Sequence, residues 1–171
     1  MELPVLMALW MGMRMSEIRG ARYEDISGGR LHICRAIVSG EHGDEVKPPK
    51  TFSGDRRISV PAHIQALIDA TGRSEGYIVP VSSQTIRNRF IRGLAAAGIP
   101  RCRFHDLRHA NAAIMVRLGV ESKYAQERNG WSDDWVYKQV YAYTMDDRMV
   151  EIDKSMDEYF GNKMATEICK K

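Results

Sequence analysis

Cysteine is scarce in this sequence, and long apolar runs are missing altogether. The three cysteines, Cys34, Cys102 and Cys169, are widely separated, and their spacing fits neither a zinc site nor a disulfide framework. No apolar stretch is long enough to cross a bilayer, and residues 1–4 lack the basic segment of a secretory signal. We therefore expect an intracellular protein with reduced cysteines and no membrane contact.

Motifs of several enzyme classes are missing as well. No glycine-rich loop ends in Gly-Lys-Ser or Gly-Lys-Thr, so ATP use is not expected. The segment 79–83 has the pattern of a loop followed by a helix cap and lacks that of a serine-hydrolase elbow. His105 and His109 are one helical turn apart and could bind zinc, but Asp106 replaces the glutamate of a zinc protease. The sequence thus predicts neither a metal nor another cofactor.

Charge of one sign is not in large excess, because the formal net charge is only +3. The charges are nevertheless segregated: residues 47–57 and 87–108 are basic, whereas residues 146–158 are acidic. The basic stretches could follow a phosphate backbone, while the acidic segment would be repelled by one and suits a protein surface. Solvated helix faces are the alternative explanation of the same charges.

The 171 residues, 44% of them hydrophobic and 27% charged, suit a single domain with one core. Hydrophobic periodicity and caps predict helices over residues 3–11 and 16–22 (with Ser16 as the N-cap), after Pro61, after Ser83, near Asp106, from about Ser122, after Asp133 and from Met149. Alternating apolar residues predict strands over residues 30–38, 45–50 and 56–60, with Lys50 near a hairpin tip. The predicted fold class is mainly α with a small antiparallel β-sheet (α+β).

The helix near Asp106 carries two kinds of side chain. His105 and Arg108 project together from its N-terminus, where unpaired backbone N–H groups favour an anion. Its common face is expected to consist of Leu107, Asn111, Ile114 and Leu118.

Three aromatic residues elsewhere in the chain are expected in the core: Trp10, Tyr124 and Trp135.

A set of arginines, a lysine, a histidine and a tyrosine without paired carboxylates is typical of phosphoryl transfer. Arg14 and Arg108 could each bind two oxygens of a phosphodiester and stabilise its transition state. A tyrosine hydroxyl could attack the phosphorus once cationic surroundings or a base favour its phenolate. A lysine could donate a proton to the leaving oxygen. This chemistry needs no metal ion.

Four segments, in this order, resemble the catalytic domain of the tyrosine recombinase, or phage integrase, family. Residues 11–17 are similar to its first box, in which a small turn presents an arginine, and residues 49–61 resemble its hairpin lysine segment. Residues 105–109, His-Asp-Leu-Arg-His, are similar to its second box and give the most specific single signal. Residues 130–132, followed by Tyr141, resemble the end of the pattern. The resemblance spans almost the whole chain and implies the family's catalytic-domain fold.

The resemblance implies site-specific DNA recombination, in which a tyrosine forms a 3′-phosphotyrosyl link and a 5′-hydroxyl leaves, without ATP or metal. Arginines clamp the scissile phosphate, the lysine is the general acid and the histidine is its acid/base partner. The catalytic residues so implied are Arg14, Lys50, His105, Arg108, Trp131 and Tyr141, with Glu17 in support. Trp131 stands where histidine is most common, and its indole N–H can donate a hydrogen bond but cannot exchange a proton. Tyr137 and Tyr143 are rival nucleophiles, and spacing favours Tyr141.

The resemblance also assigns residues 1–171 to the catalytic domain alone, without the helical core-binding domain that normally precedes it. Residues 146–171 form a last helix and tail that either pack on their own domain or dock into a neighbouring protomer. Expected partners are double-stranded DNA and further protomers, with a tetramer on DNA, in a cytoplasmic and nucleoid-associated setting. Further DNA contacts are expected at Lys47, Arg56, Arg87, Arg89, Arg101 and Arg103.

Two other functions fit the same residues. A type IB topoisomerase-like relaxase would share the nucleophile and act as a monomer on nonspecific DNA. A noncatalytic DNA-binding accessory protein would keep the fold without the reaction. Each residue, seen alone, also has an ordinary structural role, such as a helix cap for His105. The order and spacing of the four segments favour the recombinase.

Overall fold

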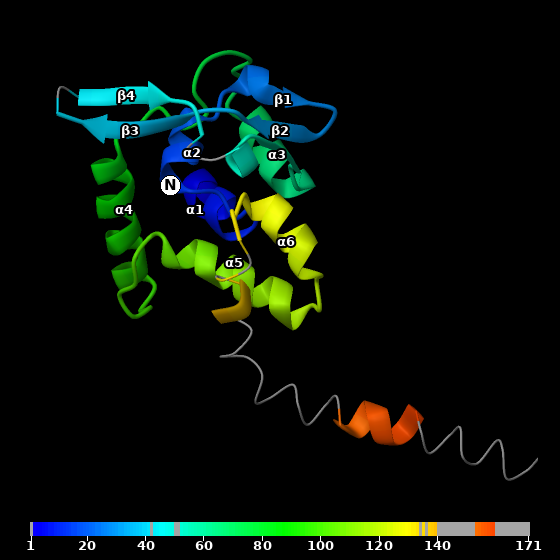
Figure 1. Cartoon of the computed structure of the whole chain (residues 1–171). Helices are drawn as coiled ribbons and strands as arrows, with labels where there is room; N and C mark the ends of the chain where they lie inside the picture. The colour runs from blue at the N-terminus through cyan, green and yellow to red at the C-terminus, as the bar shows by residue number, and fades with distance from the viewer. Residues whose placement is uncertain are drawn as a thin grey trace, which may run out of the picture.

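The structure is a computed structural model that describes residues 2–41, 43–49, 52–133, 135, 137–139 and 153–159. The α-helices are α1 (Glu2–Leu9), α2 (Met15–Gly20), α3 (Ala62–Asp69), α4 (Ser83–Ala96), α5 (Asp106–Arg117) and α6 (Ser122–Asn129). The strands are β1 (Ile26–Ser27), β2 (Arg30–Ile33), β3 (Ala36–Gly40), β4 (Gly43–Lys47) and β5 (Arg56–Ser59), and the 3-10 helices are η1 (Tyr23–Asp25) and η2 (Phe52–Gly54). The predicted fold class, mainly α with small antiparallel β structure, is confirmed (Figure 1).

Several sequence predictions fall on residues outside the described part of the chain. Lys50, Tyr141 and Tyr143 are among them, as are the expected tail residues other than 153–159. Residues 135, 137–139 and 153–159 are helical, in agreement with the helices expected after Asp133 and from Met149. In the described residues, no helix is long and apolar enough to cross a membrane.

The β structure consists of two small antiparallel sheets. Strands β1, β2 and β5 form one sheet in that order, and β3 and β4 form a separate hairpin. The single strand predicted over residues 30–38 is therefore wrong: it is interrupted between β2 and β3, where the chain passes against α2. A Cβ on Gly20 would lie 2.7 Å from the main-chain oxygen of Arg35 at this point. Strands β4 and β5, which flank Lys50 in the sequence, are not paired with each other, and Lys50 itself lies outside the described residues.

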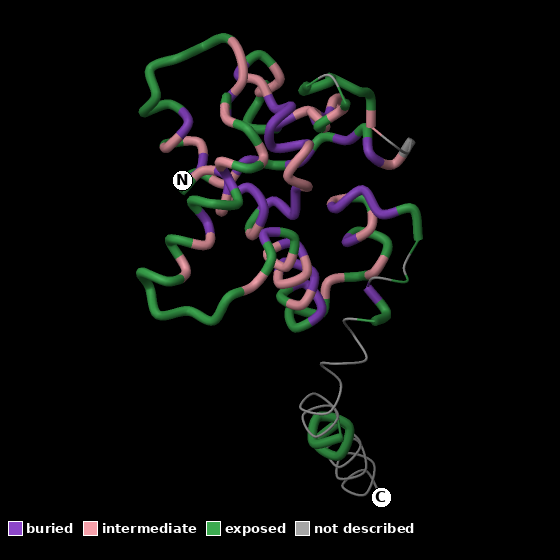
Figure 2. The backbone as a smooth tube through the Cα atoms, turned by 90° about the vertical axis from the view of Figure 1, so that its left-hand side faces the viewer, coloured by how far each residue is buried: buried purple, intermediate pink, exposed green. Residues whose placement is uncertain are grey.

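The main core lies where α1, α2, α3 and α4 meet the three-stranded sheet. Its fully buried side chains come from each of these elements and include Met7, Ile18, Leu31, Ile64 and Ile86. Figure 2 shows buried residues running through the interior of the body and exposed residues along the outer loops. The predicted apolar positions of α3 and α4 are largely confirmed, since Ile64, Ile68, Ile86 and Phe90 are buried.

The face of α5 that packs on the rest of the protein is not the predicted one. Ile114 and Leu118 are exposed, and the buried face consists of Arg108, Asn111, Ala112, Met115 and Val116. Polar side chains occupy this face because α5 packs on the C-terminal end of α1, which leaves main-chain carbonyl groups that need donors. Asn111 Nδ2 donates to Leu9 O at 2.8 Å and to Trp10 O at 3.3 Å. Hydrophobic periodicity cannot detect a face of this kind.

The three aromatic residues expected in the core are exposed: Trp10 by 49%, Tyr124 by 56% and Trp135 by 61%. Other aromatic residues are buried instead, Trp131 and Tyr137 among them. Trp131 and Tyr137 belong to a second, smaller core cluster with Ala112, Val116 and Ala125, between α5 and α6. The Tyr137 hydroxyl donates a hydrogen bond to Val120 O. Because this hydroxyl is buried and engaged, Tyr137 is not a good candidate for the nucleophile.

Candidate active site

The turn before α2 presents Arg14. Gly12 adopts φ +66, a conformation that favours glycine, and Arg14 itself is the N-cap residue of α2 in place of the predicted Ser16. The Arg14 main-chain N–H donates to Glu17 Oε2 at 2.8 Å, which is half of a capping box. Its side chain is 38% exposed, donating from Nη1 to Glu17 Oε1 at 2.7 Å and from Nη2 to Gly130 O at 3.1 Å. Two hydrogen bonds thus fix the Arg14 guanidinium group, while part of it remains exposed to solvent.

Glu17 is a buried carboxylate between two arginines. It is 5% exposed and accepts hydrogen bonds from Arg14 and from both terminal nitrogens of Arg56. Burial alone would raise the pKa of Glu17, but the hydrogen bonds and charges of Arg56 and Arg14 outweigh it and hold this pKa below its ordinary value. Glu17 therefore remains ionised at neutral pH and orients two cations.

Arg108 is the deepest cation of the site. It is 3% exposed and donates from Nη1 to Gly12 O and from Nη2 to Asn129 O, the latter at 2.5 Å. Its guanidinium carbon lies 5.6 Å from the centre of the Trp131 ring, within the range of a cation–π contact. Burial, then the positive charge of Arg14, lowers the pKa of Arg108 to about 9. The Arg108 guanidinium group is still cationic at neutral pH. A bound anion would offset the cost of burying this charge beside the positive charge of Arg14.

Two histidines stand one turn apart at the start of α5. The rings of His105 and His109 meet edge to face, with centroids 4.9 Å apart. His105 is exposed at one edge, and the partial burial of its ring lowers its pKa; the charges of His109, Arg108 and Arg14 lower it further. His105 is therefore mainly neutral at pH 7 and able to accept a proton. In the described part of the chain, no group of three or more His, Cys, Asp or Glu side chains is placed to hold a metal ion.

These side chains surround one small cavity of about 140 Å³. It is lined by Arg14, His105, Arg108, His109 and Trp131. Four of the six residues predicted as catalytic are thus brought together, from the turn before α2, the start of α5 and the segment after α6. The other two, Lys50 and Tyr141, lie outside the described residues. The cavity combines two guanidinium groups, a neutral imidazole and an indole, which suits a phosphate group with a proton acceptor beside it.

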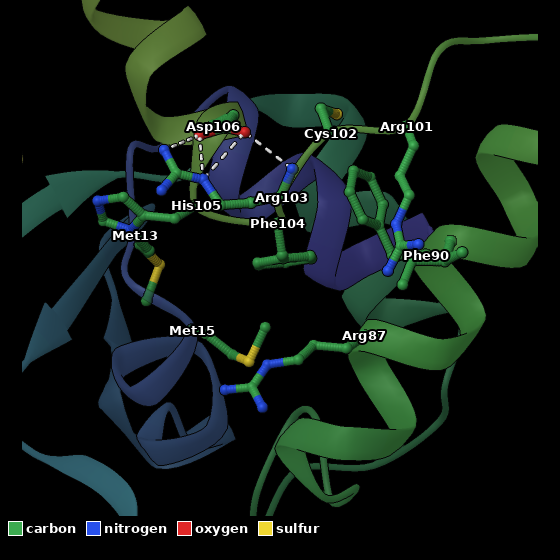
Figure 3. Close-up of a pocket in the computed structure, with 11 residues that line it drawn as sticks. Met13, Met15, Arg87, Phe90, Arg101, Cys102, Arg103, Phe104, His105 and Asp106 are labelled. Carbon is green, nitrogen blue, oxygen red and sulfur yellow. Dashed lines mark hydrogen bonds and ion pairs between the residues drawn. The ribbon is translucent and has the colours of Figure 1, made fainter.

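A larger pocket of about 700 Å³ adjoins this cavity, and His105 lines both. Its walls include Met13, Met15, Phe90 and Phe104, and its rim carries the predicted DNA-contacting residues Arg87, Arg101 and Arg103. Figure 3 shows Arg87 extending from α4 toward Met15, with Arg103 and Asp106 joined by hydrogen bonds. Three predicted cations therefore lie around an open pocket beside the cavity. Arg89 is exposed on α4 but does not line the pocket.

The remaining predicted DNA contacts lie on the β structure. Lys47 is exposed at the end of β4 and forms an ion pair with Glu45 at 2.8 Å. Arg56 requires a correction, because its side chain is buried and bonded to Glu17, Gly54 O and Arg128 O. Its hydrogen-bond donors are directed inward, so Arg56 is a structural cation and not a surface DNA contact.

Sequence reasoning missed two residues of this site. The sequence predicts no catalytic role for His109, which it offers only as a possible zinc ligand and as the end of the second box, although His109 lines the cavity next to His105. Its position four residues after His105 on one helix face was a signal that both rings would meet. The burial of Arg56 had a weaker sequence signal. Arg56 stands two residues before the buried Ile58 along β5, and residues two apart in a strand point to the same face.

The chain has relatives among known proteins. The sequence profile of the phage integrase family matches residues 2–148. The chain is 32% identical over 145 residues to a protein named as the prophage phiRv2 integrase of Mycobacterium tuberculosis, covering 75% of this chain and 38% of that relative. It is 35% identical over 71 residues to the integrase of Salmonella phage P22, covering 42% of this chain and 18% of that relative. The chain belongs to the phage integrase family, and it spans 38% of the length of the phiRv2 protein.

The fold is shared with solved integrases and recombinases. The Tn1549 transposon integrase, solved with circular intermediate DNA, superimposes with a TM-score of 0.71 at 17% identity, covering 89% of this chain and 58% of that one. The XerA recombinase gives a TM-score of 0.63 at 18% identity, covering 91% of this chain and 57% of that one. A lambda integrase dimer bound to a core site gives 0.58 at 22% identity, with 81% and 50% covered. The predicted tyrosine recombinase catalytic-domain fold is therefore confirmed.

Proposed function

We propose that this chain is the catalytic domain of a site-specific DNA recombinase that cleaves and rejoins DNA strands through a covalent phosphotyrosine. The observation that carries the proposal is the cavity in which Arg14, Arg108, His105 and Trp131 meet, although they come from three distant segments. A phosphodiester placed there would face two guanidinium groups and a neutral imidazole. Membership of the phage integrase family supports the same reaction.

Each group has a distinct task in this reaction. Arg108, held by Gly12 O and Asn129 O, would bind one phosphate oxygen from a rigid position. Arg14 would bind another through the donors that Glu17 and Gly130 O leave free. Both guanidinium groups would stabilise the charge that develops on the pentacoordinate phosphorus.

Proton transfer completes the proposed mechanism. Tyr141 attacks the phosphorus, the bond to the 5′-oxygen breaks, and the tyrosine keeps the 3′-phosphate. His105 would accept the phenolic proton, since its lowered pKa keeps the imidazole neutral at pH 7. Lys50 would donate a proton to the leaving 5′-oxygen. Reversal of the same steps by another 5′-hydroxyl rejoins the strand, so neither ATP nor a metal ion is required.

The partner of the domain is double-stranded DNA in this proposal. Arg87, Arg101 and Arg103, which line the larger pocket, would contact its backbone next to the cavity, and Arg89 would contact it from the exposed surface of α4. Of the three structural relatives described above, two were solved with DNA: the Tn1549 integrase with a circular intermediate, and the lambda integrase as a dimer on a core site. Recombination would require further protomers, and residues 146–171 are the candidate contact between them.

Covalent capture on randomised DNA tests the proposal, because the experiment itself selects the target site. The chain is incubated with nicked duplexes whose arms are randomised and whose nick lets the 5′-hydroxyl fragment diffuse away. Adducts that survive denaturation are isolated, and the attached DNA is sequenced. We expect an adduct enriched for one sequence, absent in Tyr141→Phe and present in the matched control Tyr143→Phe.

The outcomes separate the competing functions. An adduct lost in Tyr143→Phe but kept in Tyr141→Phe would move the nucleophile. Adducts without sequence enrichment, together with relaxation of supercoiled plasmid, would favour a relaxase. Sequence-specific binding without any adduct would contradict the catalytic proposal and favour an accessory DNA-binding protein.

A further inference from the structure

Arg56 joins three parts of the candidate active site through one buried guanidinium group. It is 8% exposed, and its Nη1 and Nη2 donate to the two oxygens of Glu17 at 3.2 and 3.0 Å. Its Nε donates to Arg128 O at 2.9 Å, and its Nη1 also donates to Gly54 O at 3.1 Å. The same side chain therefore holds α2, the last turn of α6 and the η2 turn.

Each of these segments leads to a residue of the proposed reaction. The carboxylate on α2 is bonded to Arg14, α6 ends shortly before Trp131, and η2 follows Lys50 in the chain. Arg56 itself does not line the 140 Å³ cavity. Any influence of Arg56 on the reaction must therefore pass through the groups that it holds.

We propose that Arg56 is a positioning residue for DNA cleavage, which satisfies Glu17 so that Arg14 can present its free donors to the scissile phosphate. This inference rests on the proposed function. Arg14 already gives one donor to Glu17 Oε1 at 2.7 Å and one to Gly130 O at 3.1 Å. A guanidinium carries five N–H donors in a fixed plane, so these two bonds decide which donors point into the cavity.

Electrostatics gives Arg56 its effect on Arg14. Glu17 faces the guanidinium groups of Arg14 and Arg56 directly and that of Arg108 at longer range. Without Arg56, the buried carboxylate would keep Arg14 as its one direct cationic partner among the described residues. A buried carboxylate that lacks donors attracts those within reach. Arg14 would then be drawn onto Glu17, away from the cavity.

The test measures single-turnover cleavage of the captured duplex at saturating DNA, for Arg56→Lys and Arg56→Met. Lysine keeps the charge but cannot reach Glu17, Gly54 O and Arg128 O together. We expect Arg56→Lys to remain folded, to bind DNA with unchanged affinity and salt dependence, and to cleave about 100-fold more slowly, as misplaced catalytic groups do. We expect the acid limb of the Arg56→Met rate profile to move to higher pH, because the pKa of Glu17 rises without its main partner.

Epistasis gives a second readout. In Arg56→Met, the further change Glu17→Gln removes the unpaired carboxylate and should release Arg14, so the double variant is expected to cleave faster than Arg56→Met alone. The matched control is Arg57→Met, which removes the same charge from the next, exposed residue of β5. This control should keep the rate at saturating DNA and the pH profile of the unaltered chain.

Three results of the cleavage and DNA-binding measurements would overturn the inference. They are an unaltered cleavage rate in Arg56→Lys, a loss of DNA affinity in Arg56→Lys with a reduced salt slope, and failure of all Arg56 variants to fold. Binding of inorganic phosphate, measured by chemical shifts of His105, separates this inference from the proposed function. Weaker phosphate binding in Arg56→Lys would support it even if no variant formed a DNA adduct, whereas equal binding, or none by the unaltered chain, would contradict it.

Discussion

The main-chain oxygen of Gly130 accepts a hydrogen bond from Arg14 Nη2 at 3.1 Å, across 116 positions of the sequence. Gly130 is the C-cap of α6 at φ +63, and a Cβ there would lie 2.8 Å from Arg56 Nη1 and 2.8 Å from Ser53 O. The end of α6 therefore sets the orientation of an arginine that is presented by a different segment. Close packing at this position leaves room for glycine alone.

Gly130→Ala is expected to impair both stability and cleavage. The left-handed conformation alone costs about 1–2 kcal/mol for a residue with a Cβ, and the contacts with Arg56 and Ser53 add to this cost. Gly98→Ala is the matched control, because Gly98 has φ +66 but a Cβ there would meet no atom within 4 Å. Thermal unfolding should show the larger loss for Gly130→Ala, and cleavage should fall only there. Equal losses would mean that the contacts with Arg56 and Ser53 have no effect.

Arg108→Lys is expected to lower cleavage by about 10²–10³-fold, the range seen when one donor to a transition-state oxyanion is removed. A lysine cannot bond Gly12 O, Asn129 O and a phosphate in one plane as Arg108 can. Single-turnover rates on captured DNA measure the effect. Arg117→Lys, an exposed change on the same helix, serves as the control. A rate close to that of the unaltered chain in Arg108→Lys would contradict the proposed clamp.

His105 is expected to titrate below the ordinary range of histidine. Burial is the main cause, and His109 adds to it, so His109→Asn should raise the pKa of His105 in part. Because the folded-state pKa is lowered, the unfolded chain takes up this proton at higher pH, and His105 should destabilise the fold as the pH falls through its unfolded pKa of about 6.5. NMR titration of the imidazole protons measures the first effect. The effect on stability is measured by the free energy of unfolding as the pH falls below about 6.5. This free energy should decrease less for His105→Asn than for the unaltered chain.

Arg87→Gln is expected to weaken DNA binding similarly for all sequences and to reduce the salt slope of log Kd by about 1, as for one lost phosphate contact. Arg87 lines the pocket beside the cavity, and Figure 3 shows its side chain extending from α4 toward Met15. Arg73→Gln removes an equal charge from an exposed residue outside the pocket. Fluorescence anisotropy at several salt concentrations compares the two. An unchanged slope in Arg87→Gln would exclude a phosphate contact at this position.

Much of the site could be predicted from the sequence because residues with the required chemistry stand at positions that a helix start or a glycine turn presents together. The residues His105 and Arg108 project from the start of a helix, as their separation indicated, and Arg14 follows a glycine turn. Fold class and most helices followed from periodicity and caps. The relation between Arg14 and Gly130 could not be predicted, because it joins segments whose contact depends on tertiary packing.

Hydrophobic patterns failed where polar side chains are buried for their hydrogen bonds. Asn111 and Arg108 lie on the buried face of α5 because they donate hydrogen bonds to main-chain carbonyl groups at the end of α1 and in the segment that follows it. Ile114 and Leu118 remain exposed. Arg56 was misassigned to the DNA surface for the same reason. A cation in a basic stretch has the same sequence signal whether its partner is a phosphate or a buried carboxylate such as Glu17.

Tyr137 acts as an anchor for the chain that follows it. Its ring is packed with Trp131 in the second core cluster, and its hydroxyl is bonded to Val120 O. Tyr141 is only four residues further along the sequence. Tyr137 thus ties the segment that leads to the proposed nucleophile to the same body that carries Arg14 and Arg108.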